Sequence, residues 1–171
     1  MEGREAASIF ESGAILQCLA EKTGRFLPAD LAGWTDALQW LYWQMGGLGP
    51  MLGQNLHFAA YAPKNIPYGI EQYVRETDRL FGVLNRRLAD RAFAAGDYSI
   101  AGMARYPWVI RLEREQPRFD DFPHIRRWAK AIAGRPATIR ACEKGKAINT
   151  APTVNEDSKT LLLGRGAALA A

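Results

Sequence analysis

The apolar positions of this chain recur at the spacing of an α-helix along most of its length. Between Asp30 and Ala59 the spacing predicts one long helix with a single buried stripe. The stripe is formed by Leu38, Leu41, Tyr42, Met45 and Leu48. Gly46–Gly47 and Gly49–Pro50 interrupt this pattern, so we expect a kink or a break in the helix there.

The same spacing predicts four more helices after residue 60. The second long helix spans about 70–88, and the third begins at Ser99 and reaches about 112. The fourth follows Pro123 and ends at Gly134, and a short last helix covers about 136–144. This succession predicts an all-α bundle.

The N-terminal part of the chain has a different pattern. Residues 7–10 form a short apolar run that predicts a strand, and Glu11 and Ser12 follow it directly. A helical pattern then runs to Gly24. The expected fold is therefore a helical bundle preceded by one strand and one helix.

Composition excludes several functional classes. The 171 residues carry a net charge of +4, which is too small to indicate a nucleic-acid-binding protein. The two cysteines, Cys18 and Cys142, lack a C-x-x-C spacing, which favours a reducing compartment. No apolar stretch is long enough to cross a membrane. We expect a soluble, cytoplasmic protein.

The junction between the predicted strand and helix is a candidate binding site. If Ser12 is the N-cap, the free amides of the first helical turn can bind a carboxylate or a phosphate. Glu11 beside it can pair with an ammonium group. Together the two residues suit the zwitterionic end of an amino acid, such as a γ-glutamyl group. A purely structural cap is the alternative, since strand–cap–helix junctions occur in most proteins.

Other reactive side chains indicate structural roles. His57 and His124 have no second ligand at helical spacing, so no metal site is predicted. Cys18 and Cys142 are expected to be inert. Four basic residues are assigned to the solvated face of the fourth helix and its end, namely Arg126, Arg127, Lys130 and Arg135.

Three stretches of sequence carry a family resemblance. The first is Glu11-Ser12-Gly13-Ala14-Ile15-Leu16, continued by 19–24, and the second is 38–55, which contains Gly46-Gly47-Leu48-Gly49-Pro50. The third is Ile66-Pro67-Tyr68 with 76–85 behind it. Together they resemble the Nu-class glutathione transferases, which include bacterial disulfide-bond oxidoreductases and a fungal nitrogen-regulating relative. The resemblance covers about 8–141.

The resemblance implies a homodimer of two-domain subunits that bind glutathione. Glu11 and Ser12 would hold its γ-glutamyl end. The segment 46–55 would border the active-site cleft and the subunit interface, with Gln54 and Asn55 as candidate polar contacts. A helix kink packed through small glycines is the structural alternative for this segment.

The sequence also departs from the family pattern. Relatives commonly have Ile-Glu-Arg-Tyr with the arginine facing the ligand, whereas this chain has Gln72 at that position, which keeps a hydrogen-bonding group without the charge. Relatives have Ser-Ile-Ala-Asp at the start of the third bundle helix. Here Gly102 replaces the aspartate of that capping box. The family residues that handle the glutathione sulfur precede this segment, so no catalytic residue is assigned.

These expectations define three regions. Residues 1–26 are interpreted as a remnant of a thioredoxin-like glutathione-binding domain, 27–147 as the all-α C-terminal domain, and 148–171 as a disordered tail. By lineage the protein conjugates glutathione to small electrophiles or reduces disulfides with it. As a fragment it is expected to be inactive alone. The alternative is a non-catalytic helical module for dimerisation or protein contacts.

Overall fold

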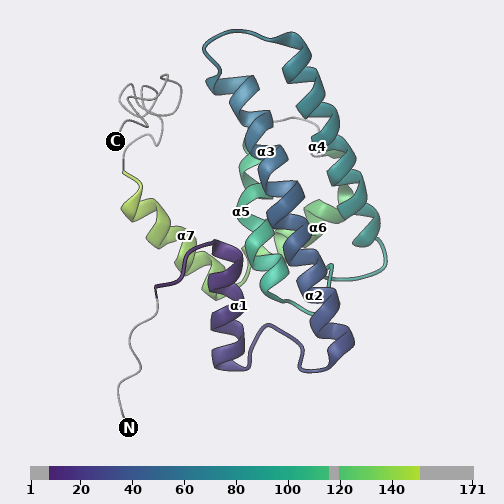
Figure 1. Cartoon of the computed structure of the whole chain (residues 1–171), viewed down its shortest axis with the longest axis vertical. Helices are drawn as coiled ribbons and strands as arrows, with labels where there is room; N and C mark the ends of the chain where they lie inside the picture. The colour runs from purple at the N-terminus through teal and green to yellow at the C-terminus, as the bar shows by residue number, and fades with distance from the viewer. Residues whose placement is uncertain (1–7, 116–119, 151–171) are drawn as a thin grey trace, which may run out of the picture.

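The chain forms a bundle of helices with one separate helix at each end (Figure 1). A computed structural model describes 8–115 and 120–150, with side chains over 8–111 and 120–150. All of the named elements in these ranges are helical. They are α1 (Ser12–Thr23), α2 (Leu31–Trp43), η1 (Gln44–Leu48), α3 (Gly49–Leu56), η2 (His57–Tyr61), α4 (Pro67–Arg87), α5 (Ile100–Glu115), α6 (Pro123–Ala133) and α7 (Pro136–Ile148). The all-α fold class is confirmed.

The strand expected at 7–10 is not present over the part that the structure describes. Residues 8–10 have no regular structure, and the Phe10 side chain is 82% exposed. A strand needs a neighbour to pair its amide and carbonyl groups. Within the described ranges no other strand lies alongside, so the apolar run has no partner to pair with.

The expected cap of α1 is corrected by one residue. Glu11, not Ser12, is the N-cap, since the Glu11 carbonyl accepts the amide of Ile15 at 2.9 Å. Ser12 is therefore the first residue of the helix. At the other end, Gly24 ends α1 in the left-handed conformation with φ of 64°, which glycine adopts without steric cost.

The irregularity predicted at Gly46–Gly47 and Gly49–Pro50 is present as a π-helical turn, and the helix does not break there. α2, η1, α3 and η2 follow one another without interruption from Leu31 to Tyr61, and η1 and η2 are π-helical. Pro50 has no amide hydrogen, and in a regular helix its ring collides with the carbonyl four residues earlier. The wider π turn of η1 places an extra residue before Pro50, which lets the helix continue past it.

The remaining helices agree with the sequence, and α7 is longer than expected. α4, α5 and α6 occupy the predicted stretches, while α7 continues to Ile148. The side-chain oxygen of Asn85 caps α6, because it accepts the amides of His124 at 2.9 Å and Ile125 at 3.2 Å. Residues 151–171 of the predicted tail lie outside the described residues.

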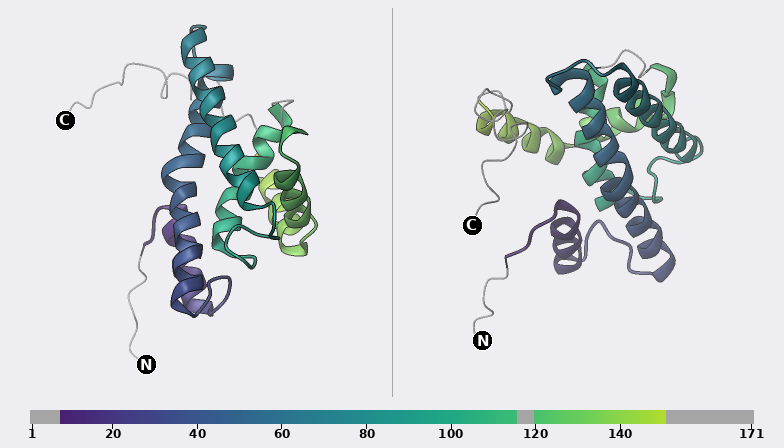
Figure 2. Two further views of the ribbon diagram at one scale, coloured as in Figure 1. Left: turned by 90° about the vertical axis from the view of Figure 1, so that its right-hand side faces the viewer. Right: turned by 45° about the horizontal axis from the view of Figure 1, so that its top comes forward.

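The core lies where the long helix meets α4, α5 and α6. Figures 1 and 2 show α3 and α4 side by side, and α4 and α5 also pack against α6. Side chains from four helices are fully buried there, including Leu52, Leu84, Val109 and Trp128. A smaller cluster joins α1 and α2 to α5 through Ala20, Leu38, Leu41, Ile100 and Ala101.

A cation is buried inside this bundle at the start of η1. Arg105 of α5 is fully buried, and its Nη2 donates to the Trp40 carbonyl at 3.0 Å. Its guanidinium carbon lies 5.3 Å from the Trp40 ring centroid and 5.4 Å from that of Trp43. Burial lowers the pKa of Arg105 to about 9, so the group stays protonated at neutral pH. Arg105 thus ties α5 to the point where α2 becomes π-helical.

Candidate functional site

A cavity of about 240 Å³ lies between the N-terminal half of α1 and the end of α2. On the α1 side, Glu11 carries a charge and Gln17 can form hydrogen bonds, and the other lining residues come from α1, α2 and η1. The lining residues are Glu11, Gly13, Ala14, Gln17, Tyr42 and Met45. The cavity therefore forms at the junction that the sequence marked as a candidate site.

The close approach of α1 to the long helix depends on Gly13. A Cβ atom added to Gly13 would lie 3.1 Å from Met45 Cγ, which is tighter than ordinary van der Waals contact. On the next turn the Tyr42 hydroxyl donates to Gln17 Oε1 at 3.4 Å, a long hydrogen bond. Glycine at the contact and this polar pair beyond it shape the cavity.

Glu11 has a strained backbone at the mouth of this cavity. Its φ of 67° and ψ of 116° are unusual for a residue with a side chain. Such strain costs on the order of 1–3 kcal/mol and is typical of functional sites. No side chain caps α1, so its first amides are available to a bound anion. The exposed Ser12 hydroxyl lies in the same turn.

Of the five predicted site residues only Glu11 lines this cavity, and Ser12 lies next to it in the chain. Gln54 on α3 and Gln72 on α4 are exposed to solvent. Asn55 is buried, and its Nδ2 donates to Thr77 Oγ1 at 2.8 Å, which in turn donates to the Tyr73 carbonyl at 2.8 Å. Asn55 therefore joins α3 to α4. The structure brings Glu11 and Ser12 together and keeps the other three on α3 and α4.

The sequence pattern did not predict the wall of the cavity that the long helix forms. Tyr42 and Met45 were assigned to the buried stripe, yet Tyr42 is 59% exposed. Leu38, Leu41 and Leu48 are buried as predicted. Tyr42 lies at the edge of that stripe, one residue after Leu41, and a hydroxyl at a stripe edge is the signal that points to a partly solvated position. Gln17 carried no such signal.

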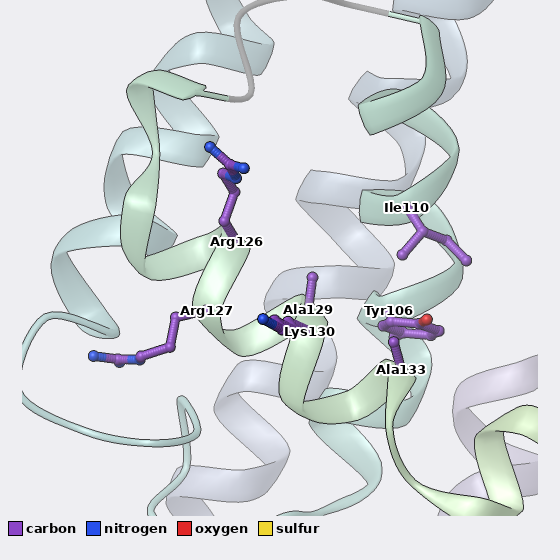
Figure 3. A pocket seen from close by; sticks show the side chains of 7 residues that line it. All are labelled: Tyr106, Ile110, Arg126, Arg127, Ala129, Lys130 and Ala133. Atoms are coloured by element: carbon purple, nitrogen blue, oxygen red, sulfur yellow. The ribbon is translucent and has the colours of Figure 1, made fainter.

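A second cavity, of about 360 Å³, lies between α5 and α6 and is lined by cations (Figure 3). Figure 3 shows Arg126 and Arg127 leaving α6 in different directions. Arg126 pairs with Asp120 at 2.5 Å, and Arg127 donates to the carbonyls of Leu88 and Arg91. Arg126, Arg127 and Lys130 are exposed as predicted, and Arg127 in addition holds the end of α4. The two guanidinium groups do not converge on a common ligand.

Over 8–115 and 120–150, no group of three or more His, Cys, Asp or Glu side chains is arranged to hold a metal ion. None of the helices in that part of the chain combines the length and apolar character needed to cross a membrane.

Comparison with known proteins defines the class of this chain. The family model described as "Glutathione S-transferase, C-terminal domain" matches 66–136, which covers α4, α5 and α6. Disulfide-bond oxidoreductase YfcG of Escherichia coli K12 is 49% identical over 146 residues, which are 85% of this chain and 68% of that protein. The chain belongs to the glutathione S-transferase family, on the Nu-class-like bacterial branch.

Two further relatives agree with this assignment. Disulfide-bond oxidoreductase YghU of Escherichia coli K12 is 45% identical over 141 residues, 77% of this chain and 49% of the relative. A glutathione transferase from Burkholderia graminis, solved with two glutathione molecules per subunit, matches with a TM-score of 0.74 and 45% identity, over 77% of this chain and 58% of its own. The chain thus spans about half to two thirds of these relatives.

Proposed function

We propose that this chain carries the γ-glutamyl end of a glutathione site, in a protein that conjugates glutathione to electrophiles or reduces disulfides with it. The observation that carries the proposal concerns Glu11, which has a strained backbone and an exposed carboxylate. It lies at the uncapped N-terminus of α1 and lines a cavity. The glutathione-bound Burkholderia relative supports it.

The chemistry of the junction suits a zwitterion. The Glu11 carboxylate pairs with the α-ammonium of the γ-glutamyl group. The α-carboxylate accepts hydrogen bonds from the free amides of α1 and from the Ser12 hydroxyl, at the positive end of the helix dipole. We extend the proposal to the exposed Gln54 and Gln72 as polar contacts on α3 and α4, with Asn55 holding those two helices in place.

This set of contacts predicts weak binding by the 171 residues alone. Each charge-assisted contact at an exposed helix end contributes about 1 kcal/mol, whereas a millimolar ligand needs about 4 kcal/mol. The family resemblance puts the cysteinyl and glycyl contacts, and the group that activates the thiol, on a thioredoxin-like domain. We therefore propose that the chain alone binds glutathione no better than millimolar and has no turnover.

Calorimetry with glutathione tests the proposal, on the chain and on a fusion that places a relative's thioredoxin-like domain ahead of Ser8. The fusion is expected to bind glutathione and to show transferase or disulfide-reductase activity. In the fusion, Ser12→Ala and Glu11→Gln should each weaken binding, while Thr23→Ala at the opposite end of α1 should not. Micromolar binding or clear turnover by the chain alone would show that the site lies elsewhere.

The second candidate function is a non-catalytic dimerisation module, and the outer face of α1 favours it. Ile15 and Leu19 lie one turn apart on this face and are exposed. Burying them against a second copy would stabilise a homodimer. Light scattering during gel filtration tests this. We expect a dimer that Leu19→Ser weakens and that Ile139→Ser on α7 does not, and a monomer at all concentrations would exclude the candidate.

A further inference from the structure

The cavity of about 360 Å³ between α5 and α6 has one apolar wall and one cationic wall (Figure 3). Tyr106 and Ile110 lie one turn apart on α5 and form the apolar wall. The α6 wall carries Arg126, Arg127, Ala129, Lys130 and Ala133. None of these residues is acidic, and none lines the cavity at Glu11. We call this surface the α5–α6 groove, and it is separate from the proposed glutathione site.

The apolar wall of the groove is already formed by the packing of the bundle. Tyr106 is 8% exposed, and its ring packs edge to face on the buried Trp128 with centroids 6.3 Å apart. Ala129 and Ala133 lie one turn apart on α6, and their small side chains leave space between the two helices. A partner can therefore bury an apolar side chain there without rearranging the core.

The cations of the groove are accessible to a partner. Arg126 Nη1 pairs with Asp120 Oδ1 at 2.5 Å, and both side chains are exposed to solvent. An exposed pair of this kind contributes little free energy, so another carboxylate can take the place of Asp120. Lys130 lies one turn after Arg126 and is exposed, and it pairs with no acidic side chain in the described ranges. The two cations are separated by about 6 Å along the axis of α6.

The spacing of these side chains specifies the partner. The apolar pair on α5 and the cationic pair on α6 each repeat at one helical turn, which matches side chains on the faces of another helix. Arg126 and Arg127 point in different directions (Figure 3), so one compact anion does not contact both. We propose that the α5–α6 groove docks an amphipathic acidic helix of a partner protein. Its apolar residues lie against Tyr106 and Ile110, and its carboxylates, one turn apart, contact Arg126 and Lys130.

Charge and lining favour a protein helix over a nucleic acid. A nucleic-acid site needs a broad basic face that follows the phosphates. This chain has a net charge of only +4, and only the α6 wall of the groove is basic. An amphipathic helix uses both walls, and the complementary charge fixes its orientation.

The experiment measures fluorescence anisotropy of a fluorescein-labelled helical peptide with leucines on one face and glutamates on the other, titrated with the full chain. We expect saturable binding of one peptide per chain. A peptide with glutamines in place of the glutamates should bind about tenfold more weakly, because charge-assisted contacts are lost. A peptide that keeps the glutamates and has serines in place of the leucines should also bind about tenfold more weakly, because less apolar surface is buried.

Variants of the chain test the cationic wall. Arg126→Gln combined with Lys130→Gln should weaken binding of the acidic leucine peptide about tenfold and leave the glutamine peptide unchanged. Arg140→Gln is the matched control, because Arg140 is an exposed cation on α7 that does not line the groove. Arg127 is left in place, since it holds the end of α4. Arg126→Glu combined with Lys130→Glu should reverse the preference, towards a peptide with lysines in place of the glutamates.

A further variant tests the apolar wall. Ala133 is exposed at the groove, so Ala133→Trp places a large ring in the groove without entering the core. This variant should lose most of its affinity for the leucine peptides while keeping the helical circular dichroism and melting temperature of the parent. Those two measurements separate a filled groove from a misfolded chain.

Several results would overturn the proposal. They are equal affinity of the parent and the double glutamine variant for the acidic leucine peptide, equal affinity of the parent for the serine and leucine peptides, or tighter binding of a single-stranded oligodeoxynucleotide. Anisotropy that falls again as the concentration of the chain rises would also overturn it, because a second copy would then fill the groove. Millimolar glutathione should leave peptide binding unchanged, so failure of the proposed glutathione site does not affect this test.

Discussion

The α1 helix and the α4 helix belong to one chain but are held in very different ways. α4 buries Thr77, Leu80, Phe81 and Leu84 between the long helix and α6. α1 buries Gly13 and Ala20, and its outer face leaves Ile15 and Leu19 exposed. The residues with candidate chemistry, Glu11 and Ser12, lie on the weakly held helix.

This difference places most of the stability of the fold in the bundle and the candidate binding residues on α1. The main cluster of the core lies within η1–α6, and α1 adds a single buried apolar side chain, Ala20, to the smaller cluster, so we expect α1 to contribute little to the folding free energy. α1 is attached through the small cluster at Ala20 and places a strained Glu11 at its end. Segments with few buried contacts open at lower free energy, and binding sites are often drawn from them. Variants in the two regions and their exchange rates test this difference between α1 and the bundle.

The largest effect is expected from deleting a leucine in the bundle core. Leu84 is fully buried, and Leu84→Ala should lower the free energy of unfolding by about 3 kcal/mol because it removes apolar contacts and leaves a cavity. Leu19 is 53% exposed, and Leu19→Ala should change it by less than about 0.5 kcal/mol. Urea unfolding of both variants measures this. Similar losses for the two leucines would remove the contrast between the regions.

The second largest loss of stability is expected from replacing Arg105. Arg105→Ala should cost about 2–3 kcal/mol, because it opens a cavity beside Trp40 and Trp43 and frees the Trp40 carbonyl. Arg105→Met keeps the volume and removes a desolvated charge, so it should be neutral or stabilising. Melting temperatures of the two variants and the parent measure both effects. A methionine variant as unstable as the alanine variant would show that the charge itself holds the helices together.

Hydrogen exchange compares the two regions without mutation. Amides of α1 should exchange at least tenfold faster than those of α2 and α4, a difference of about 1.4 kcal/mol or more in opening free energy. The reason is the small buried surface of α1. Measurement by mass spectrometry on peptides from 12–23 and 67–87 gives the ratio. Equal protection would mean that α1 is as firmly held as the core.

The last of these substitutions is expected to increase stability. Gly102→Asp should stabilise the domain by about 1–2 kcal/mol, since it removes a helix glycine and supplies the carboxylate of a capping box three residues after Ser99. A Cβ on the buried Gly102 fits, because it would lie 3.7 Å from the Tyr98 ring and 3.8 Å from Ile132, in ordinary van der Waals contact.

Gly102→Ala is the matched control for that change. It has the gain in helix propensity without the carboxylate, so it should stabilise by about 1 kcal/mol at most. Thermal melts of both variants against the parent separate the two contributions. A melting temperature for the aspartate variant at or below that of the parent would refute the capping explanation.

The local signals of the sequence were sufficient for the helices. The apolar spacing and the glycine stop at Gly24 act over a few residues, so they predicted α1, α2 and α4 without any distant contact. The predicted strand at 7–10 failed because a strand, unlike a helix, takes its hydrogen bonds from other segments. The glycines and Pro50 marked where the long helix is irregular but not in what form, because a π turn absorbs the proline within the helix instead of a break.

Tertiary structure alone decided which of these residues form sites. Nothing local distinguishes Arg105, which is buried, from Arg135, which stacks on Tyr98 over a cavity. The proximity of Glu11 to Tyr42 and Met45, and the use of Asn55 to join α3 to α4, likewise depend on how distant helices cross. Sequence by itself determined the helices and the family, because periodicity and motifs are local. The cavities came from packing, since their walls are residues far apart in the chain.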